Sequence, residues 1–151
     1  MLALKCNNLA LAWFYIQSGA DLHIRDNKKR SLLFFTKDAQ VITYLIDQGL
    51  NPDQPDDFNC TPLFYAASED IARCLIECGA DIHARNNNGW TPLIWHKKPG
   101  IVRVLIEYGA DINARDRKGR TPLDLAFEDT LKQLLIAHGA VSGKTESFLH
   151  S

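Results

Sequence analysis

The sequence predicts an all-α fold, a solenoid of about five stacked helix-turn-helix repeats with hairpin-like loops between them. Two marks recur in phase. Glycines follow an apolar run every 30 residues, at Gly19, Gly49, Gly79, Gly109 and Gly139. Eighteen residues before a glycine, the triplet Thr-Pro-Leu begins at Thr61, Thr91 and Thr121, with a degenerate copy at Ser31. Self-similarity at a fixed period of this size is the signature of a repeat array.

Each mark has a local physical meaning. Thr before Pro starts a helix, because the hydroxyl accepts from free backbone N–H groups and Pro fits the first turn. Gly ends a helix because it enters the left-handed region at low cost. The second of the two helices between the marks carries an apolar stripe, such as Ile71, Cys74, Leu75 and Cys78. One helix pair cannot bury such a stripe alone, so the copies must stack.

The repeated segments resemble the ankyrin repeat family. TPLFYAA (61–67), TPLIWHK (91–97) and TPLDLAF (121–127) resemble its TPLHxAA signature, and GADIHAR (79–85) and GADINAR (109–115) resemble its GADxNA segment. The resemblance covers residues 1–140, with repeats at about 1–30, 31–60, 61–90, 91–120 and 121–140. Ankyrin repeats usually run ~33 residues, so we expect a clipped inner helix or a tighter turn between the helices. Residues 141–151 have no periodicity, which predicts a flexible C-terminal tail.

Composition narrows the function. The net charge of -1 disfavours a nucleic-acid partner. No apolar run approaches the ~20 residues of a membrane span. The apolar N-terminal stretch is interrupted by Asn7 and Asn8 and has only Lys5 as an early charge, which argues against a signal peptide. We expect a cytoplasmic protein, or one in the host cytosol if it is an effector, that is monomeric on its own.

Motifs of catalysis and metal binding are missing from the sequence. It contains no Gly-rich phosphate loop, GxSxG elbow or HExxH helix, and its five histidines are scattered. A metal site from Cys74, Cys78 and His83 is conceivable, but the spacing is poor and both cysteines fit the apolar stripe. We therefore expect no enzyme activity, no metal and no cofactor, and reduced thiols that fill the core.

The ankyrin resemblance implies that the inter-repeat loops form a row of fingers, that the first helices form a palm, and that a partner protein lies against both. Loop 1 (25–30) carries a net charge of +3, loop 2 (51–60) -3, loop 3 (83–90) +1 and loop 4 (113–120) +3. This alternation favours a patterned protein surface over a uniformly negative nucleic-acid backbone. The alternative is that these charges only keep the loops soluble.

The palm is predicted to be aromatic. The fifth residue from successive marks gives a ladder of Phe35, Tyr65 and Trp95, and Trp90 lies close to it at the base of loop 3. Such side chains dominate binding energy at interfaces, although they can also pack between adjacent inner helices. Our hypothesis is that Trp90 and Trp95 are partly exposed and hold the partner.

The fourth copy departs from its own pattern. It has His96-Lys97 where the third copy has Ala66-Ala67, so His96 must turn outward or find a hydrogen bond. Local exceptions are where function is expected, and sequence drift is the alternative. Pro99 either ends the inner helix early or starts the outer one.

Together, the loops and the palm predict one partner-binding surface. Its residues are Lys28, Lys29, Arg30, Phe35, Asp57, Phe58, Tyr65, Asn87, Asn88, Trp90, Trp95, His96, Arg117, Lys118 and Arg120. The predicted function is a non-catalytic module that binds one partner protein. An inhibitor or immunity-type protein that neutralises an enzyme or toxin, and a bacterial or viral effector that engages a host protein, remain open as alternatives.

Overall fold

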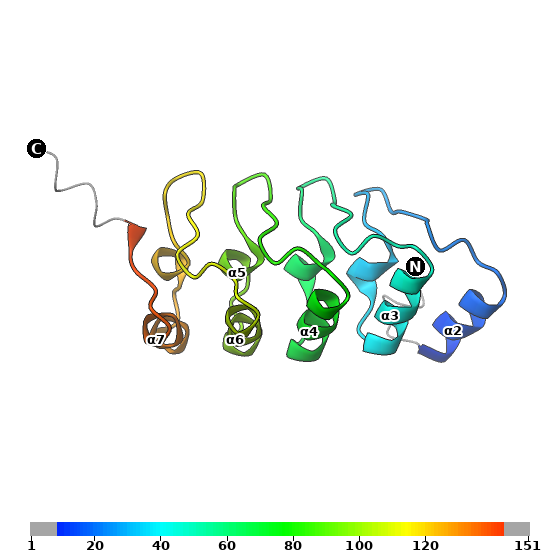
Figure 1. Cartoon of the computed structure of the whole chain (residues 1–151). Helices are drawn as coiled ribbons and strands as arrows, with labels where there is room; N and C mark the ends of the chain where they lie inside the picture. The colour runs from blue at the N-terminus through cyan, green and yellow to red at the C-terminus, as the bar shows by residue number, and fades with distance from the viewer. Residues whose placement is uncertain (1–8, 144–151) are drawn as a thin grey trace, which may run out of the picture. The chain divides into compact units, whose positions relative to one another are not determined.

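The computed structural model of the chain describes the backbone of residues 9–143 and the side chains from Trp13 onward (Figure 1). Every regular element in this range is a helix, and the range contains no strand. This confirms the predicted all-α class. The chain divides into two compact units, residues 1–81 and residues 82–151. Each unit is described by itself below.

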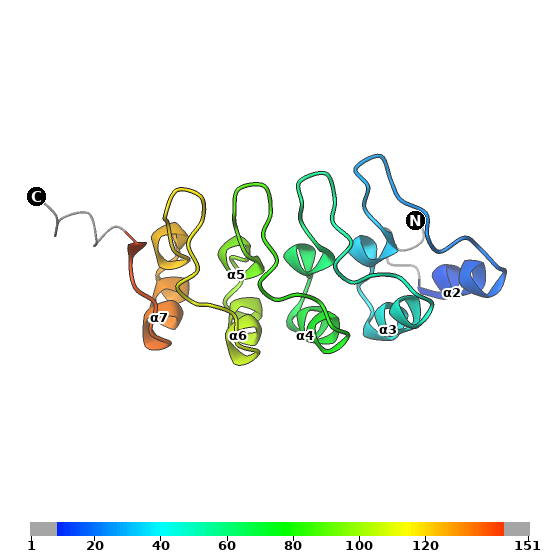
Figure 2. The same ribbon diagram turned by 45° about the horizontal axis from the view of Figure 1, so that its top comes forward.

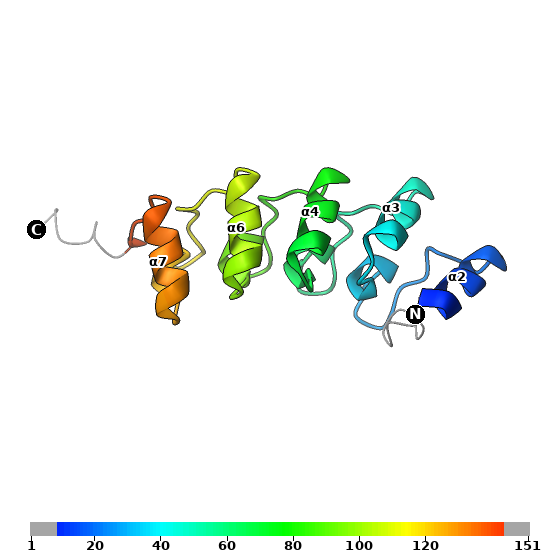
Figure 3. The same cartoon turned by 90° about the horizontal axis from the view of Figure 1, so that it is seen from below.

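Unit 1 contains long helices that pack side by side, and each of those that follow the first is preceded by a single helical turn. Its elements are α2 (Leu9–Gln17), η1 (Leu32–Phe35), α3 (Ala39–Asp47), η2 (Pro62–Tyr65) and α4 (Glu69–Glu77). Helices α3 and α4 lie alongside each other, and so do η1 and η2 (Figure 3). The rings of Trp13 and Tyr44 meet edge to face with centroids 5.2 Å apart, which joins α2 to α3.

Unit 2 repeats the same arrangement. It contains α5 (Pro92–Trp95), α6 (Pro99–Glu107), η3 (Leu123–Leu125) and α7 (Asp129–Ala137). Helix α6 packs alongside α7. In each unit the one-turn helices lie between the loops on one side and the long helices on the other (Figure 2). The loops and the one-turn helices therefore present a surface that the long helices do not cover.

The length of the inner helices accounts for the short repeat. The helices η1, η2, α5 and η3 have three or four residues each, whereas α3, α4, α6 and α7 have nine. The clipped inner helix expected from the 30-residue period is thus confirmed. Pro99 is the first residue of α6, so it starts the outer helix.

The predicted start and stop signals hold, with one difference in the capping. Pro62 and Pro92 stand in the first helical turn, and Gly79 and Gly109 have φ of 92° and 87° after α4 and α6. The hydroxyl of Thr91 accepts from the backbone N of Ile94 at 3.4 Å, as expected. The hydroxyl of Thr61, however, is buried without a hydrogen bond. A predicted cap therefore forms only where the local turn brings the N–H group within reach.

The core of each unit is the apolar stripe of its long helices packed against its one-turn helices. Phe64, Ile42 and Leu45 are fully buried in unit 1, and Ile94 and Leu105 are buried in unit 2. Because this core holds both ends of every loop, the loops project from a fixed base.

Candidate protein-binding site

One residue anchors each of the four loops. The anchors recur at 30-residue intervals, at Asp26, Asp56, Asn86 and Asp116. The backbone N of each anchor donates to the carbonyl four residues on, at 2.9–3.0 Å, and the anchor carbonyl accepts from the residue three positions on. The side-chain Oδ1 accepts two further backbone N–H bonds inside the loop. These bonds close each loop as a tight hairpin without strands.

The third residue after each anchor has left-handed backbone geometry. Lys29 has φ of 61°, Asn59 59°, Gly89 74° and Gly119 74°. A residue with a Cβ adopts this region only at a cost, which hydrogen bonds on both sides of it must offset. The shared geometry shows that the four loops are copies of one turn, although their sequences differ.

Neighbouring loops within a unit are bonded to each other. In unit 1, Asp57 N donates to Lys28 O at 3.1 Å, and Lys29 Nζ lies 3.0 Å from Asp57 Oδ1. In unit 2, Arg117 N donates to Asn88 O at 3.2 Å. Each unit therefore presents its two loops as one connected surface.

Arginine side chains add a second link between loops in unit 2. Arg85 Nη1 donates to Gly89 O in its own loop at 2.9 Å and to Arg115 O in the next loop at 2.7 Å. Arg115 does the same one repeat later, to Gly119 O and Gly143 O. These guanidinium groups fix the backbone, so part of the basic charge predicted for binding has a structural role.

The palm of unit 1 is built around Tyr65. Its ring lies 5.6 Å from that of Phe34, and its hydroxyl donates to Asp56 Oδ2 at 3.0 Å. Burial, with the neighbouring Cys60 and Asp56, raises the pKa of Tyr65 above its usual range, so the phenol stays protonated. The Arg30 guanidinium lies 4.7 Å above the ring of Phe35. Phe35 and Tyr65 line one hollow of about 160 Å³ at the one-turn helices η1 and η2.

The palm of unit 2 is a pair of tryptophans. Trp90 and Trp95 are both partly exposed, with ring centroids 5.9 Å apart and planes at 58°. Trp90 Nε1 donates to Asp116 Oδ2 at 3.0 Å, which links loop 3 to loop 4. The same oxygen accepts from Arg120 Nε and Nη2 at 2.9 and 2.7 Å.

The Asp116 carboxylate is the buried centre of this cluster, with a side chain only 1% exposed. Burial alone would raise its pKa, but hydrogen bonds from Arg120, Lys118 and Trp90 outweigh burial and lower it. Asp116 is therefore ionised and neutralises Arg120 across the physiological range. The sequence analysis counted it only as one loop charge, although the 30-residue recurrence of the anchors was a visible signal for its role.

The other predicted site residues fall into an exposed and a partly exposed group, with one exception. Those exposed are Lys28, Lys29, Asp57, Phe58, Asn87, Asn88, Arg117 and Lys118, and those partly exposed are Arg30, Phe35, Tyr65, Trp90, Trp95 and Arg120. The exception is His96, which is only 7% exposed and was wrongly placed on the surface.

The end of α5 explains the position of His96. The helix stops at Trp95, and His96 continues in extended geometry with φ of -72° and ψ of 136°. Ala66 occupies the same repeat position and is also buried, so the backbone directs this side chain inward in both copies. Lys97 is the residue that turns outward, and its Nζ donates to Ile94 O at 3.0 Å and to Leu125 O at 3.3 Å.

Asp124 is a polar site that the sequence analysis did not identify. It stands where other copies have Phe64 and Ile94, and this change was the available signal. Its carboxylate accepts from Thr121, from Ser142 Oγ at 2.6 Å and from Gly143 N at 2.8 Å. These bonds hold residues 141–143 of the expected tail against the last repeat; residues 144–151 lie outside the described range.

Asp124 has an acidic carboxyl group as a result. Burial by itself would raise its pKa, but the bonds from Ser142, Thr121 and Gly143 outweigh burial and lower the pKa to about 2. It is therefore ionised over most of the accessible pH range.

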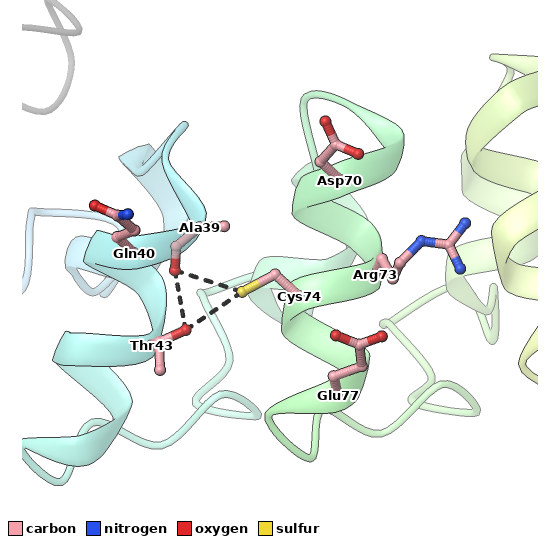
Figure 4. Close-up of a pocket in the computed structure, with 7 residues that line it drawn as sticks. All are labelled: Ala39, Gln40, Thr43, Asp70, Arg73, Cys74 and Glu77. Carbon is pink, nitrogen blue, oxygen red and sulfur yellow. Dashed lines mark hydrogen bonds between the residues drawn. The ribbon is translucent and has the colours of Figure 1, made fainter.

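A second hollow of about 370 Å³ lies between α3 and α4, away from the loops (Figure 4). Cys74 Sγ there lies 3.5 Å from Ala39 O and 3.7 Å from Thr43 Oγ1, and burial raises the pKa of the Cys74 thiol. A raised pKa leaves little thiolate, which is the nucleophilic and metal-binding form. Within residues 9–143, no three His, Cys, Asp or Glu side chains are grouped to hold a metal ion.

Comparison with known proteins agrees with the geometry. A family model described as ankyrin repeats (3 copies) matches residues 1–86 and 68–145. No curated protein matches the chain. Among the described residues, no helix is long and apolar enough to cross a membrane. Ankyrin repeats are generally protein–protein interaction modules and are typically non-catalytic. The chain belongs to the ankyrin repeat family.

Proposed function

We propose that the protein is a non-catalytic module that binds one partner protein through its loops and one-turn helices. The observation that carries the proposal is the pair of partly exposed tryptophans, Trp90 and Trp95, of which Trp90 is bonded to the buried carboxylate of Asp116 in loop 4. Tryptophan is among the side chains that dominate interface energies. An anchor already fixed in position loses little conformational entropy on binding, which favours affinity.

Unit 1 supports the same proposal with a second recognition feature. Phe35 and Tyr65 line a hollow of about 160 Å³, a volume that suits a single apolar side chain of a partner. Phe58 in loop 2 of the same unit is 57% exposed. Aromatic side chains with this exposure gain from being covered by another protein. Cys60, Cys74 and Cys78 are not joined in disulfides, which suits a reducing compartment such as the cytoplasm.

A site-specific cross-linking experiment tests the proposal. A photo-reactive amino acid is placed at Asn87, exposed in loop 3, and in a matched protein at Arg103, exposed on the long helix α6. In extracts of the source cells, the Asn87 position should capture one protein that the Arg103 position does not. Equal capture at both positions, or capture of nucleic acid alone, contradicts the proposal.

The captured protein then serves for a binding measurement. Trp95→Ala and Trp90→Phe should each raise its Kd, and Trp95→Ala should do so by roughly 30-fold or more, the loss typical of an interface hot spot. Circular dichroism shows whether the variants keep the fold. Arg103→Ala, on the opposite side of the unit, should leave the Kd unchanged.

A further inference from the structure

We propose that loops 3 and 4 bind an acidic segment of the partner, with an apolar side chain of that segment packed against Trp90 and Trp95. The inference rests on the proposed function and adds the chemistry of the partner. It follows from how the structure distributes the loop charges between the two units.

The surplus of positive charge belongs to unit 2 alone. Loops 1 and 2 contain four basic and four acidic residues, and the pair Lys29–Asp57 joins them at 3.0 Å. Loops 3 and 4 contain five basic residues and a single acidic residue, Asp116. The whole chain has a net charge of -1, so this surplus is local. A basic surface on an otherwise balanced protein attracts a complementary acidic one.

Three of the five basic side chains already have partners. Arg85 and Arg115 donate to loop carbonyls, and Arg120 is bonded to Asp116. These three guanidinium groups keep their positive charge, but some of their N–H groups already donate hydrogen bonds within the protein. They therefore add to the positive potential without being the main contacts.

Arg117 and Lys118 are the two that remain available. Both are exposed at the tip of loop 4, and no acidic side chain of the described residues pairs with either. Their backbone is fixed, because Arg117 N donates to Asn88 O at 3.2 Å and Lys118 N donates to Asp116 Oδ1 at 2.8 Å. Two exposed cations on a hydrogen-bonded turn suit carboxylate side chains of a partner, which they meet by charge-assisted hydrogen bonds.

The occupant is a protein segment and not a nucleic acid because of the number and surroundings of these cations. Nucleic-acid affinity grows with the number of phosphates neutralised, and two available cations neutralise few. The exposed amides of Asn87 and Asn88 beside them suit hydrogen bonds to a peptide. The tryptophan pair adds a place for an apolar side chain, which a peptide of mixed acidic and apolar residues supplies.

Titration with defined probes tests this inference on the full chain. The probes are a 12-residue peptide of Glu and Asp with a central Phe-Leu, the same peptide with Lys in place of each acidic residue, and a 12-nucleotide single-stranded RNA. Indole fluorescence in a Trp13→Phe background reports on Trp90 and Trp95. The acidic peptide should bind and shift the emission, with a Kd that rises with salt. Equal or tighter binding of the basic peptide or the RNA, or no binding of the acidic peptide at low salt, overturns the inference.

A charge reversal provides the matched control. The double variant Arg117→Glu/Lys118→Glu should raise the Kd of the acidic peptide by at least about tenfold. The control Arg103→Glu/Lys132→Glu makes the same change in net charge on helices α6 and α7, and it should change the Kd by less than about twofold. An equal effect of both double variants overturns the inference. Suppose that a partner is cross-linked at Asn87 and yet binds with the same Kd after the charge reversal in loop 4. In that case the inference of an acidic segment is wrong, while the proposed function stands. If no loop-specific partner exists, the proposed function itself fails.

Discussion

The indole nitrogen of Trp90 lies 3.0 Å from Oδ2 of Asp116, and this bond between residues 26 apart in the sequence helps to join loops 3 and 4. The carboxylate that accepts it is shielded from solvent and is also bonded to Arg120. A negative charge that would repel an acidic partner is thus withdrawn from the surface, and the indole is held in place by it.

Asp116→Ala should strongly destabilise the protein. The change removes the carboxylate that accepts hydrogen bonds from Trp90 and Arg120, so their N–H donors lose their acceptor in a partly buried position. We therefore expect the free energy of unfolding to fall by about 3 kcal/mol. Asp111→Ala, which removes an exposed acceptor for Asn113 N, should lower it by about 1 kcal/mol or less. Urea denaturation measures both. Similar losses for the two variants would contradict the role given to Asp116.

Gly89→Ala should cost more stability than Gly109→Ala. Both glycines have left-handed backbone, with φ of 74° and 87°, so each alanine costs about 1 kcal/mol from that alone. A Cβ on Gly89 would also meet the backbone N and Cγ of Arg117 at 3.0 Å, whereas a Cβ on Gly109 meets nothing within 4 Å. Thermal unfolding of the two variants compares the costs. A larger loss for Gly109→Ala would show that the close approach of loops 3 and 4 does not matter.

The Asp124 carboxylate should give the protein a stability that acid removes. Its pKa is about 2 in the folded chain, below the usual 3.8. A carboxyl group whose pKa is lower in the folded than in the unfolded chain stabilises the protein at pH values above its unfolded pKa. This contribution to the free energy of unfolding is lost as the pH falls from about 4 to about 2. Asp124→Asn should therefore lower the unfolding temperature at pH 6, and its difference from the natural protein should narrow as pH falls through that window. Asp47→Asn, exposed at the end of α3, controls for the loss of one negative charge. A difference that stays constant with pH would contradict the prediction.

Gly143→Ala should release residues 141–143 from the last repeat. A Cβ at this position would meet the carbonyl oxygen of Gly119 at 2.2 Å, which no small adjustment relieves. Limited proteolysis should then cut faster near residue 141, because an open backbone is a better substrate. Ser142→Ala, which loses one hydrogen bond to Asp124 without an overlap, should give a smaller increase. Equal cutting of the natural protein and Gly143→Ala would contradict the docking of this segment.

Much of the fold is readable from the sequence because its signals are local. Pro62 and Pro92 fix a helical turn through their own ring, and Gly79 and Gly109 end a helix through their own backbone freedom. The period of 30 residues then implies stacking, since each helix pair has an apolar face to bury. These inferences can be made without knowing how close residues that are far apart in the chain come to each other.

The site is less readable, because its properties depend on such distances. Arg85 and Arg117 have the same charge in the sequence, but one is bonded to carbonyls of two loops and the other is exposed. Asp116 is a surface charge by composition and a buried acceptor by position. His96 is an exception to its repeat that the backbone after α5 directs inward. The 30-residue spacing marks Asp116 as a recurring position, but its burial, the bonds of Arg85 and the direction of His96 depend on the folded backbone.

The hairpin turn that recurs in all four loops carries two residues between the positions that determine it. The anchor and the left-handed residue three positions later determine the turn, and between them stand Asn27-Lys28, Asp57-Phe58, Asn87-Asn88 and Arg117-Lys118. Asp57 also links loops 1 and 2 through Lys29 Nζ, whereas Arg117 and Lys118 hold loop 4 through their backbone N–H groups. The backbone of loop 4 can therefore stay the same while these two side chains change, so the turn separates the groups that carry it from the groups that it displays.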